Sequence, residues 1–186
     1  MFNYNNKYIL TFVAKLLHPT NKVDISYLTT SQIFWDRLVK ISSAHLVLPA
    51  IYGALKRKKL DNYVPTDLLS YLQEISNLNL NRNIEILNQI AFLSTLLKKH
   101  KIKHVFLKGA AMLILKQYNA LEERMIGDID ILIKKNELIK TQKILLSNGF
   151  QSKELPKSDY AKGLKEISAR HLHRLINRDF ISAVEL

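Results

Sequence analysis

The spacing of apolar residues changes at about residue 101, and this change constrains the fold more than any other feature of the sequence. Before it, apolar residues recur every three or four positions over residues 3–18, 31–58 and 67–100, a pattern typical of packed amphipathic helices. Pro19 breaks the first of these helices, and Pro49 kinks or divides the second. We therefore expect a helical region over residues 1–100.

After residue 101, strand patterns alternate with helical ones. Residues 103–108 and 126–133 are predicted strands, each followed by a helix, at residues 110–118 and 137–148. Residues 167–176 and 180–186 are two further predicted strands, joined by a hairpin turn at residues 177–179. We expect an α+β protein whose amino-terminal helical region packs on a small mixed β-sheet core over residues 101–186.

The composition excludes several classes of site. The chain has no cysteine, which rules out disulfides, thiol catalysis and thiolate metal sites and fits a reducing compartment. The apolar stretch at residues 8–17 is interrupted by Lys15 and is too short to span a bilayer. We expect a cytoplasmic protein that does not enter the membrane.

The chain is strongly basic, with 28 Lys and Arg residues against 16 Asp and Glu residues and a net charge of +12. Lysine clusters at residues 56–59 and 98–103 would attract nucleotides or nucleic acids. A general excess of lysine on solvated helix faces explains the same charge equally well. A basic nucleic-acid-binding protein therefore stays open as one interpretation.

Two aspartates mark the second predicted strand. Side chains alternate between the faces of a strand, so Asp128 and Asp130 share one face while Ile129, Ile131 and Ile133 point into the core. Their Cα atoms lie ~6.7 Å apart at the usual rise of a strand. Two carboxylates at this spacing can bind the same pair of ions, and Mg²⁺ prefers carboxylate and phosphate oxygens. The pair predicts a magnesium and nucleotide site.

A second element precedes the aspartates, where a strand turns into a helix at Lys108 and Gly109. The first N–H groups of a helix have no partner within the helix, and they attract anions. Gly109 would let the backbone approach a phosphate closely, and Lys108 would add a positive charge. A Lys-Gly pair before a helix is common, so it indicates a triphosphate site only in combination with the aspartates.

The two elements in this order, FLKGAA at residues 106–111 and RMIGDIDILI at residues 124–133, resemble the uncharacterised nucleotidyltransferase family of the DNA polymerase β-like superfamily. The resemblance extends to the helices before the motif and to AVEL at residues 183–186, which looks like the family strand that carries a third acidic residue. It covers nearly the whole chain.

The resemblance implies an enzyme that uses two Mg²⁺ ions and a nucleoside triphosphate. Asp128 and Asp130 would bind both ions, and Glu185 would join one of them and help to deprotonate the attacking hydroxyl. Gly109 would contact the triphosphate, and Arg124 would neutralise phosphate charge. A nucleoside monophosphate would be transferred to a hydroxyl of a small molecule, a protein or a nucleic acid, with release of pyrophosphate.

Two departures from the pattern support a second interpretation. Better-known members of the superfamily carry Ser after the glycine, where this chain has Ala110. The chain also stops at Leu186, where related chains look longer, so we expect a core that is truncated at its carboxyl end. Both features favour a catalytically weak module that binds a nucleotide or a partner and acts in a regulatory or antitoxin-like role.

Two histidines offer a further metal hypothesis. His171 and His173 would share one strand face, but no third ligand follows at a usable spacing. We expect them to face the surface or a phosphate group.

Overall fold

A computed structural model of the chain describes residues 5–23, 28, 31–152 and 174–186. These residues form six α-helices and a five-stranded mixed sheet, which confirms the predicted α+β class and the amino-terminal helical region. Packing divides the chain into two compact units, residues 1–81 with 118–125 and residues 82–117 with 126–186. The long helix α4 (Thr66–Lys99) contributes its first half to one unit and its second half to the other. The predicted domain boundary at residue 100 stays a prediction.

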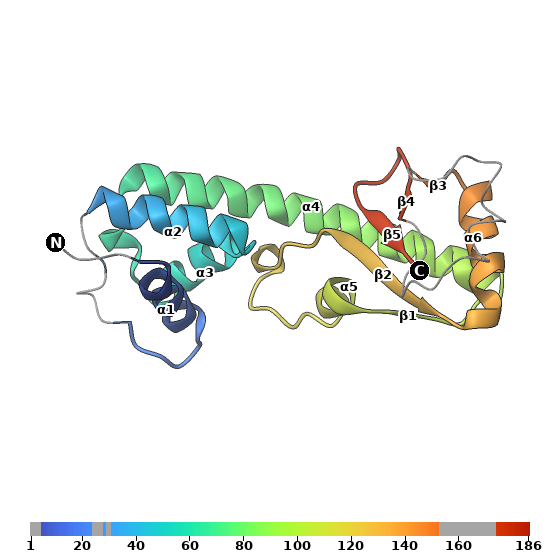
Figure 1. Cartoon of the computed structure of the whole chain (residues 1–186), viewed down its shortest axis with the longest axis horizontal. Coiled ribbons are helices and arrows are strands. Elements are labelled where there is room, and N and C mark those ends of the chain that lie inside the picture. Colours follow the sequence, from blue (N-terminus) through green and yellow to red (C-terminus); the bar gives the residue numbers. More distant parts are fainter. Residues whose placement is uncertain (1–4, 24–27, 29–30, 153–173) are drawn as a thin grey trace. The chain divides into compact units, whose positions relative to one another are not determined.

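The first unit is helical. It contains α1 (Asn6–Leu17), α2 (Gln32–Ala44), α3 (Leu48–Arg57), the 3₁₀ turns η2 (Asp61–Tyr63) and η3 (Leu121–Glu123), and the start of α4 (Figure 1). Pro49 lies in the first turn of α3, where its missing N–H costs nothing, so it divides the helical stretch as expected. The core centres on Phe34, whose ring meets Phe12 and Trp35 edge to face at centroid distances of 5.3 and 5.0 Å.

The segment that leads into the predicted motif is anchored within this first unit. The Asn79 side-chain nitrogen, on α4, donates to the carbonyl oxygens of Glu122 at 2.6 Å and Arg124 at 2.9 Å. The Arg57 guanidinium forms an ion pair with Glu123, whose side chain is only 5% exposed. These contacts satisfy buried polar groups and fix the backbone of residues 118–125.

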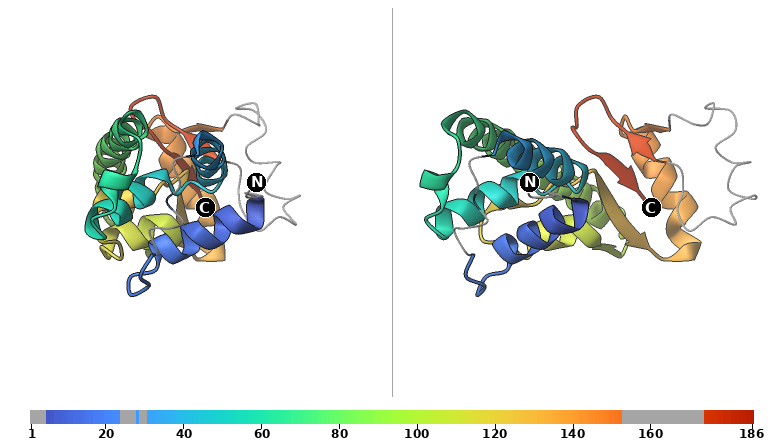
Figure 2. Two further views of the ribbon diagram at one scale, coloured as in Figure 1. Left: turned by 90° about the vertical axis from the view of Figure 1, so that its left-hand side faces the viewer. Right: turned by 60° about the vertical axis from the view of Figure 1, so that its left-hand side comes forward.

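The second unit is built on the sheet. Its strands are β1 (His104–Phe106), β2 (Asp128–Ile133), β3 (Gln151–Ser152), β4 (Leu175–Ile176) and β5 (Ala183–Glu185), in the order β1-β2-β5-β4-β3. The pair β2–β5 is parallel, and the other pairs are antiparallel. Helix α5 (Lys108–Ile114), the turn η4 (Lys135–Glu137) and helix α6 (Leu138–Ser147) complete it. Figure 2 shows β5, in red, beside β2.

The inward residues of β2 are those expected. Ile129, Ile131 and Ile133 are at most 7% exposed, and Val184 of β5 is fully buried beside Ile129, its partner in the register. Phe180, in the β4–β5 connection, stacks on Phe150 with a centroid distance of 5.8 Å. Ile129 and Val184 therefore pack where β2 pairs with β5, and the Phe180–Phe150 stack packs the β4–β5 connection against the residue before β3.

Four of the described helices end on a non-glycine residue in the left-handed backbone region: Leu46 (φ 56°), Lys59 (φ 55°), Lys101 (φ 60°) and Lys116 (φ 51°). In each case the next N–H bonds back to the carbonyl five residues earlier, as from Gln117 to Met112 at 3.1 Å. This is the Schellman end, where glycine is usual. The helix expected over residues 110–118 therefore stops at Ile114 without a glycine to mark it.

The predicted hairpin is present, with Leu175 of β4 opposite Val184 of β5. Strand β3 was not predicted, since two residues show no periodicity. Most of the strand expected over residues 167–176, with His171 and His173, lies outside the described residues. None of the described helices has the length and apolar character needed to cross a membrane.

Candidate active site

Three carboxylates gather on neighbouring strands of the second unit. Asp128 and Asp130 lie on β2, and the parallel register places Glu185 of β5 directly beside Asp130. Adjacent strands are ~4.8 Å apart, so residues paired in this way are close neighbours. The side chains of Asp128, Asp130 and Glu185 are 24%, 6% and 14% exposed. We call these three residues the carboxylate cluster.

Two cationic side chains bind the carboxylate cluster. Lys108 Nζ lies 2.6 Å from Asp130 Oδ1. Arg174, just before β4, bridges the other two carboxylates, with Nη2 2.5 Å from Asp128 Oδ2 and Nε 2.5 Å from Glu185 Oε1. Each carboxylate of the cluster therefore has a charged hydrogen-bond partner, an arrangement that offsets the repulsion between like charges.

The three carboxylates of the cluster raise the pKa values of the two cations that bind them. The hydrogen bond from Lys108 to Asp130 raises the pKa of Lys108 above its ordinary value, and the charges of Asp130, Glu185 and Asp128 add to this. The pKa of Arg174 is raised first by its hydrogen bond to Glu185, then by the charges of Glu185 and Asp128. Both cations stay protonated at neutral pH.

The backbone conformation at the start of α5 places the Lys108 side chain beside the carboxylate cluster. Lys108 has a φ of 48°, a left-handed conformation that costs a non-glycine residue about 1 kcal/mol or more. The preceding N–H, of Leu107, donates to the carbonyl oxygen of Asp130 at 3.0 Å and ties the turn to β2. The strained residue is thus held by backbone bonding on one side and by its own ion pair on the other.

Gly109 has a packing role. A Cβ atom at this position would lie 3.1–3.2 Å from three carbon atoms of the Ile126 side chain, which is tighter than ordinary contact. The glycine therefore lets α5 pack closely on the segment that leads into β2. Its predicted contact with a triphosphate stays a prediction.

A model of one protein family matches residues 31–185, and that family is described as uncharacterised nucleotidyltransferase. The chain belongs to this family. The match runs from the helices of the first unit to Glu185, and it confirms the resemblance found in the sequence. The chain accordingly falls in the transferase class of enzymes. No curated protein and no solved structure matches it.

Arg124 is the predicted site residue of this nucleotidyltransferase that lies outside the second unit. Arg124 belongs to the first unit, directly after η3, and its carbonyl oxygen accepts from Asn79. Its role toward phosphate stays a prediction. Ala110, the position at which the resemblance to the wider superfamily led us to expect Ser, is fully buried.

Sequence reasoning missed Arg174. The predicted three-residue turn at 177–179 would pair Arg174 with Ser182, whereas the observed pairing of Leu175 with Val184 extends to Arg174 opposite Glu185. An arginine opposite a predicted acidic ligand is a strong cross-strand pair. Its second partner, Asp128, lies 46 residues earlier in the chain, and only the fold brings the two together.

The donor chemistry of the carboxylate cluster fits Mg²⁺, since three carboxylates supply the hard oxygen ligands that this ion prefers. In the part of the chain that the structure describes, no group of three His, Cys, Asp or Glu side chains is already arranged to hold a metal ion. Lys108 and Arg174 hold carboxylate oxygens of the cluster instead. A metal ion would therefore compete with these cations for those oxygens.

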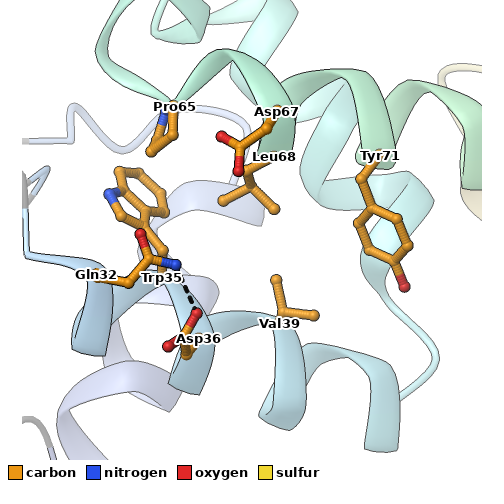
Figure 3. A pocket seen from close by; sticks show the side chains of 8 residues that line it. All are labelled: Gln32, Trp35, Asp36, Val39, Pro65, Asp67, Leu68 and Tyr71. Atoms are coloured by element: carbon orange, nitrogen blue, oxygen red, sulfur yellow. Dashed lines mark hydrogen bonds between the residues drawn. The ribbon is translucent and has the colours of Figure 1, made fainter.

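The first unit has a separate pocket of about 190 Å³ between α2 and α4 (Figure 3). Gln32 in its wall donates to Asp36 Oδ1 at 2.8 Å. The pocket is lined by Gln32, Trp35, Asp36, Val39, Pro65, Asp67, Leu68 and Tyr71, and so contains none of the predicted site residues. We assign it no part in nucleotide chemistry.

Proposed function

We propose that this chain is a magnesium-dependent nucleotidyltransferase that moves a nucleoside monophosphate from a nucleoside triphosphate to an acceptor hydroxyl. The observation that carries the proposal is the parallel register of β2 and β5, which sets Glu185 beside Asp130. Three carboxylates on two adjacent strands provide a ligand set for two Mg²⁺ ions. The acceptor hydroxyl belongs to a small molecule, a protein or a nucleic acid.

In the proposed reaction Asp128 and Asp130 would hold the two ions, and bound ions would supply Lewis-acid stabilisation of the attacking and leaving oxygens. The acceptor oxygen attacks the α-phosphorus in line, and its proton passes to Glu185. The bond from the α-phosphorus to the bridging oxygen breaks, and pyrophosphate leaves.

In this proposal Lys108 binds the triphosphate of the substrate. Its side chain, 59% exposed, is free to turn from Asp130 to the triphosphate. Such a move would replace one anionic partner with another and release Asp130 for an ion.

The absence of cysteine from the sequence supports the cytoplasm as the place of action.

The test is magnesium-dependent release of pyrophosphate from each of the four ribonucleoside triphosphates. Asp128→Asn and Asp130→Asn keep the side-chain shape but remove the charges, and each should abolish the release. Asp179→Asn, at an exposed turn position of the same unit, is the matched control and should leave it unchanged. Equal rates in all four proteins would reject the proposal.

One observation favours a second candidate function, a nucleotide- or partner-binding module with little turnover. Each carboxylate of the cluster already has a cationic partner in Lys108 or Arg174, and these bonds compete with metal ligation. This candidate predicts nucleotide binding without release of pyrophosphate. Calorimetric titration with a non-hydrolysable triphosphate, run beside the pyrophosphate assay, separates the two functions.

A further inference from the structure

Arg174 joins two carboxylates that are far apart in the chain. Its guanidinium contacts Asp128 on β2 through Nη2 and Glu185 on β5 through Nε, both at 2.5 Å. The arginine side chain is 56% exposed, whereas its partners are 24% and 14% exposed. Arg174 therefore covers the solvent side of the carboxylate cluster and is not part of the core.

The charge balance at the cluster changes when substrate arrives. Three carboxylates and two cations, Lys108 and Arg174, leave a net charge of −1. Two Mg²⁺ ions would supply the carboxylates with stronger partners, while the triphosphate would bring several negative charges of its own. A guanidinium matches phosphate and carboxylate geometry equally well, and an exposed arginine side chain is free to turn between them.

We propose that Arg174 is a positioning residue that competes with the metal for Asp128 and Glu185 in the free chain and transfers to the phosphate groups when nucleotide binds. This inference rests on the proposed function. It couples metal binding to nucleotide binding, because phosphate offers the arginine a new partner and so reduces its competition for the carboxylates. Arg174 then has opposite effects on two affinities: it weakens binding of the metal alone and strengthens binding of the nucleotide.

These opposite effects distinguish the proposal from a merely structural role. A residue that only holds the hairpin together would, on removal, lower both affinities with the stability of the sheet. The experiment uses Mn²⁺ as the metal probe, with the free ion measured by electron paramagnetic resonance in the absence of nucleotide. Binding of a non-hydrolysable triphosphate is then measured by calorimetry with Mn²⁺ at saturation.

Arg174→Gln should bind Mn²⁺ about tenfold more tightly than the natural chain and bind the triphosphate about tenfold more weakly. Arg174→Lys keeps the charge but lacks the planar guanidinium that binds two oxygens at once. Both of its affinities should therefore lie between those of the natural chain and Arg174→Gln. Arg178→Gln, four residues away at an exposed turn position, is the matched control and should equal the natural chain. Unchanged affinities in both Arg174 variants, or a parallel loss of both affinities, would overturn the inference.

Failure of this inference is distinguishable from failure of the proposed function. If Asp128→Asn loses Mn²⁺ binding while both Arg174 variants match the natural chain, the carboxylate site stands and only the role of Arg174 is rejected. If Asp128→Asn and Asp130→Asn bind Mn²⁺ as well as the natural chain does, the proposed metal site fails, and the inference fails with it.

Discussion

Gln89 and Ser182 exchange two buried hydrogen bonds: Gln89 Nε2 donates to the Ser182 carbonyl oxygen at 2.8 Å, and the Ser182 N–H donates to Gln89 Oε1 at 3.1 Å. The Gln89 side chain thus supplies hydrogen-bond partners for both backbone groups of Ser182, as a neighbouring strand would. Ser182 Oγ also donates to the carbonyl oxygen of Gly127 at 3.2 Å, just before Asp128. One helical side chain therefore fixes the strand that carries Glu185.

Gln89→Ala should lower the free energy of unfolding by about 2 kcal/mol, because it leaves a buried N–H and a buried carbonyl without partners. Gln73→Ala, on the exposed side of the same helix, is the matched control and should change it little. Urea denaturation followed by circular dichroism measures both. We also expect Gln89→Ala to slow pyrophosphate release, since Glu185 loses its support. Equal stability of the two variants would show that these hydrogen bonds do not anchor β5.

The two glycines near the cluster should respond oppositely to alanine. Gly109→Ala forces a methyl group against Ile126 and should destabilise the chain by about 2 kcal/mol. Gly127→Ala should be tolerated, because a Cβ there would meet no atom within 4 Å. Thermal unfolding compares the two variants, and adding Ile126→Val to Gly109→Ala should recover part of the loss. A Gly109→Ala variant as stable as Gly127→Ala would contradict the packing role.

Features set by residues close together in the sequence, such as strand faces and the hairpin, were predicted. Alternation in β2 predicted that Asp128 and Asp130 share a face and that Ile129 and Ile131 are buried, and burial confirmed the inward isoleucines. The hairpin was predicted from its turn. Arg174 and Gln89 were missed because their partners lie 46 and 93 residues away, and no local periodicity reports such pairs. The end of α5 was misjudged, because Lys116 takes the place of the usual glycine there.

Asn79 supports the segment before β2 from within the first unit. Asn79→Ala removes the donor to two carbonyl oxygens, those of Glu122 and Arg124, and should lower stability by about 2 kcal/mol. The control is Asn77→Ala, at an exposed position on the same helix. Trp35, the one tryptophan in the sequence and 2% exposed, reports unfolding of this unit by its fluorescence. A midpoint shared by both variants would count against the anchoring role.

The Lys108–Asp130 ion pair should persist far into the alkaline range. The folded state raises the pKa of Lys108, first through its hydrogen bond to Asp130, so folding favours the protonated amine. The stabilisation is complete below the pKa of the unfolded chain and is lost as pH rises through the raised folded pKa. Reductive methylation with ¹³C-formaldehyde and an NMR pH titration measure this value, with Lys108→Arg to assign the resonance. In Asp130→Asn the pKa should fall toward that of an ordinary lysine. A resonance that titrates identically in both proteins would mean that the ion pair does not form in solution, and Asp130 would then be available to a metal without competition from Lys108.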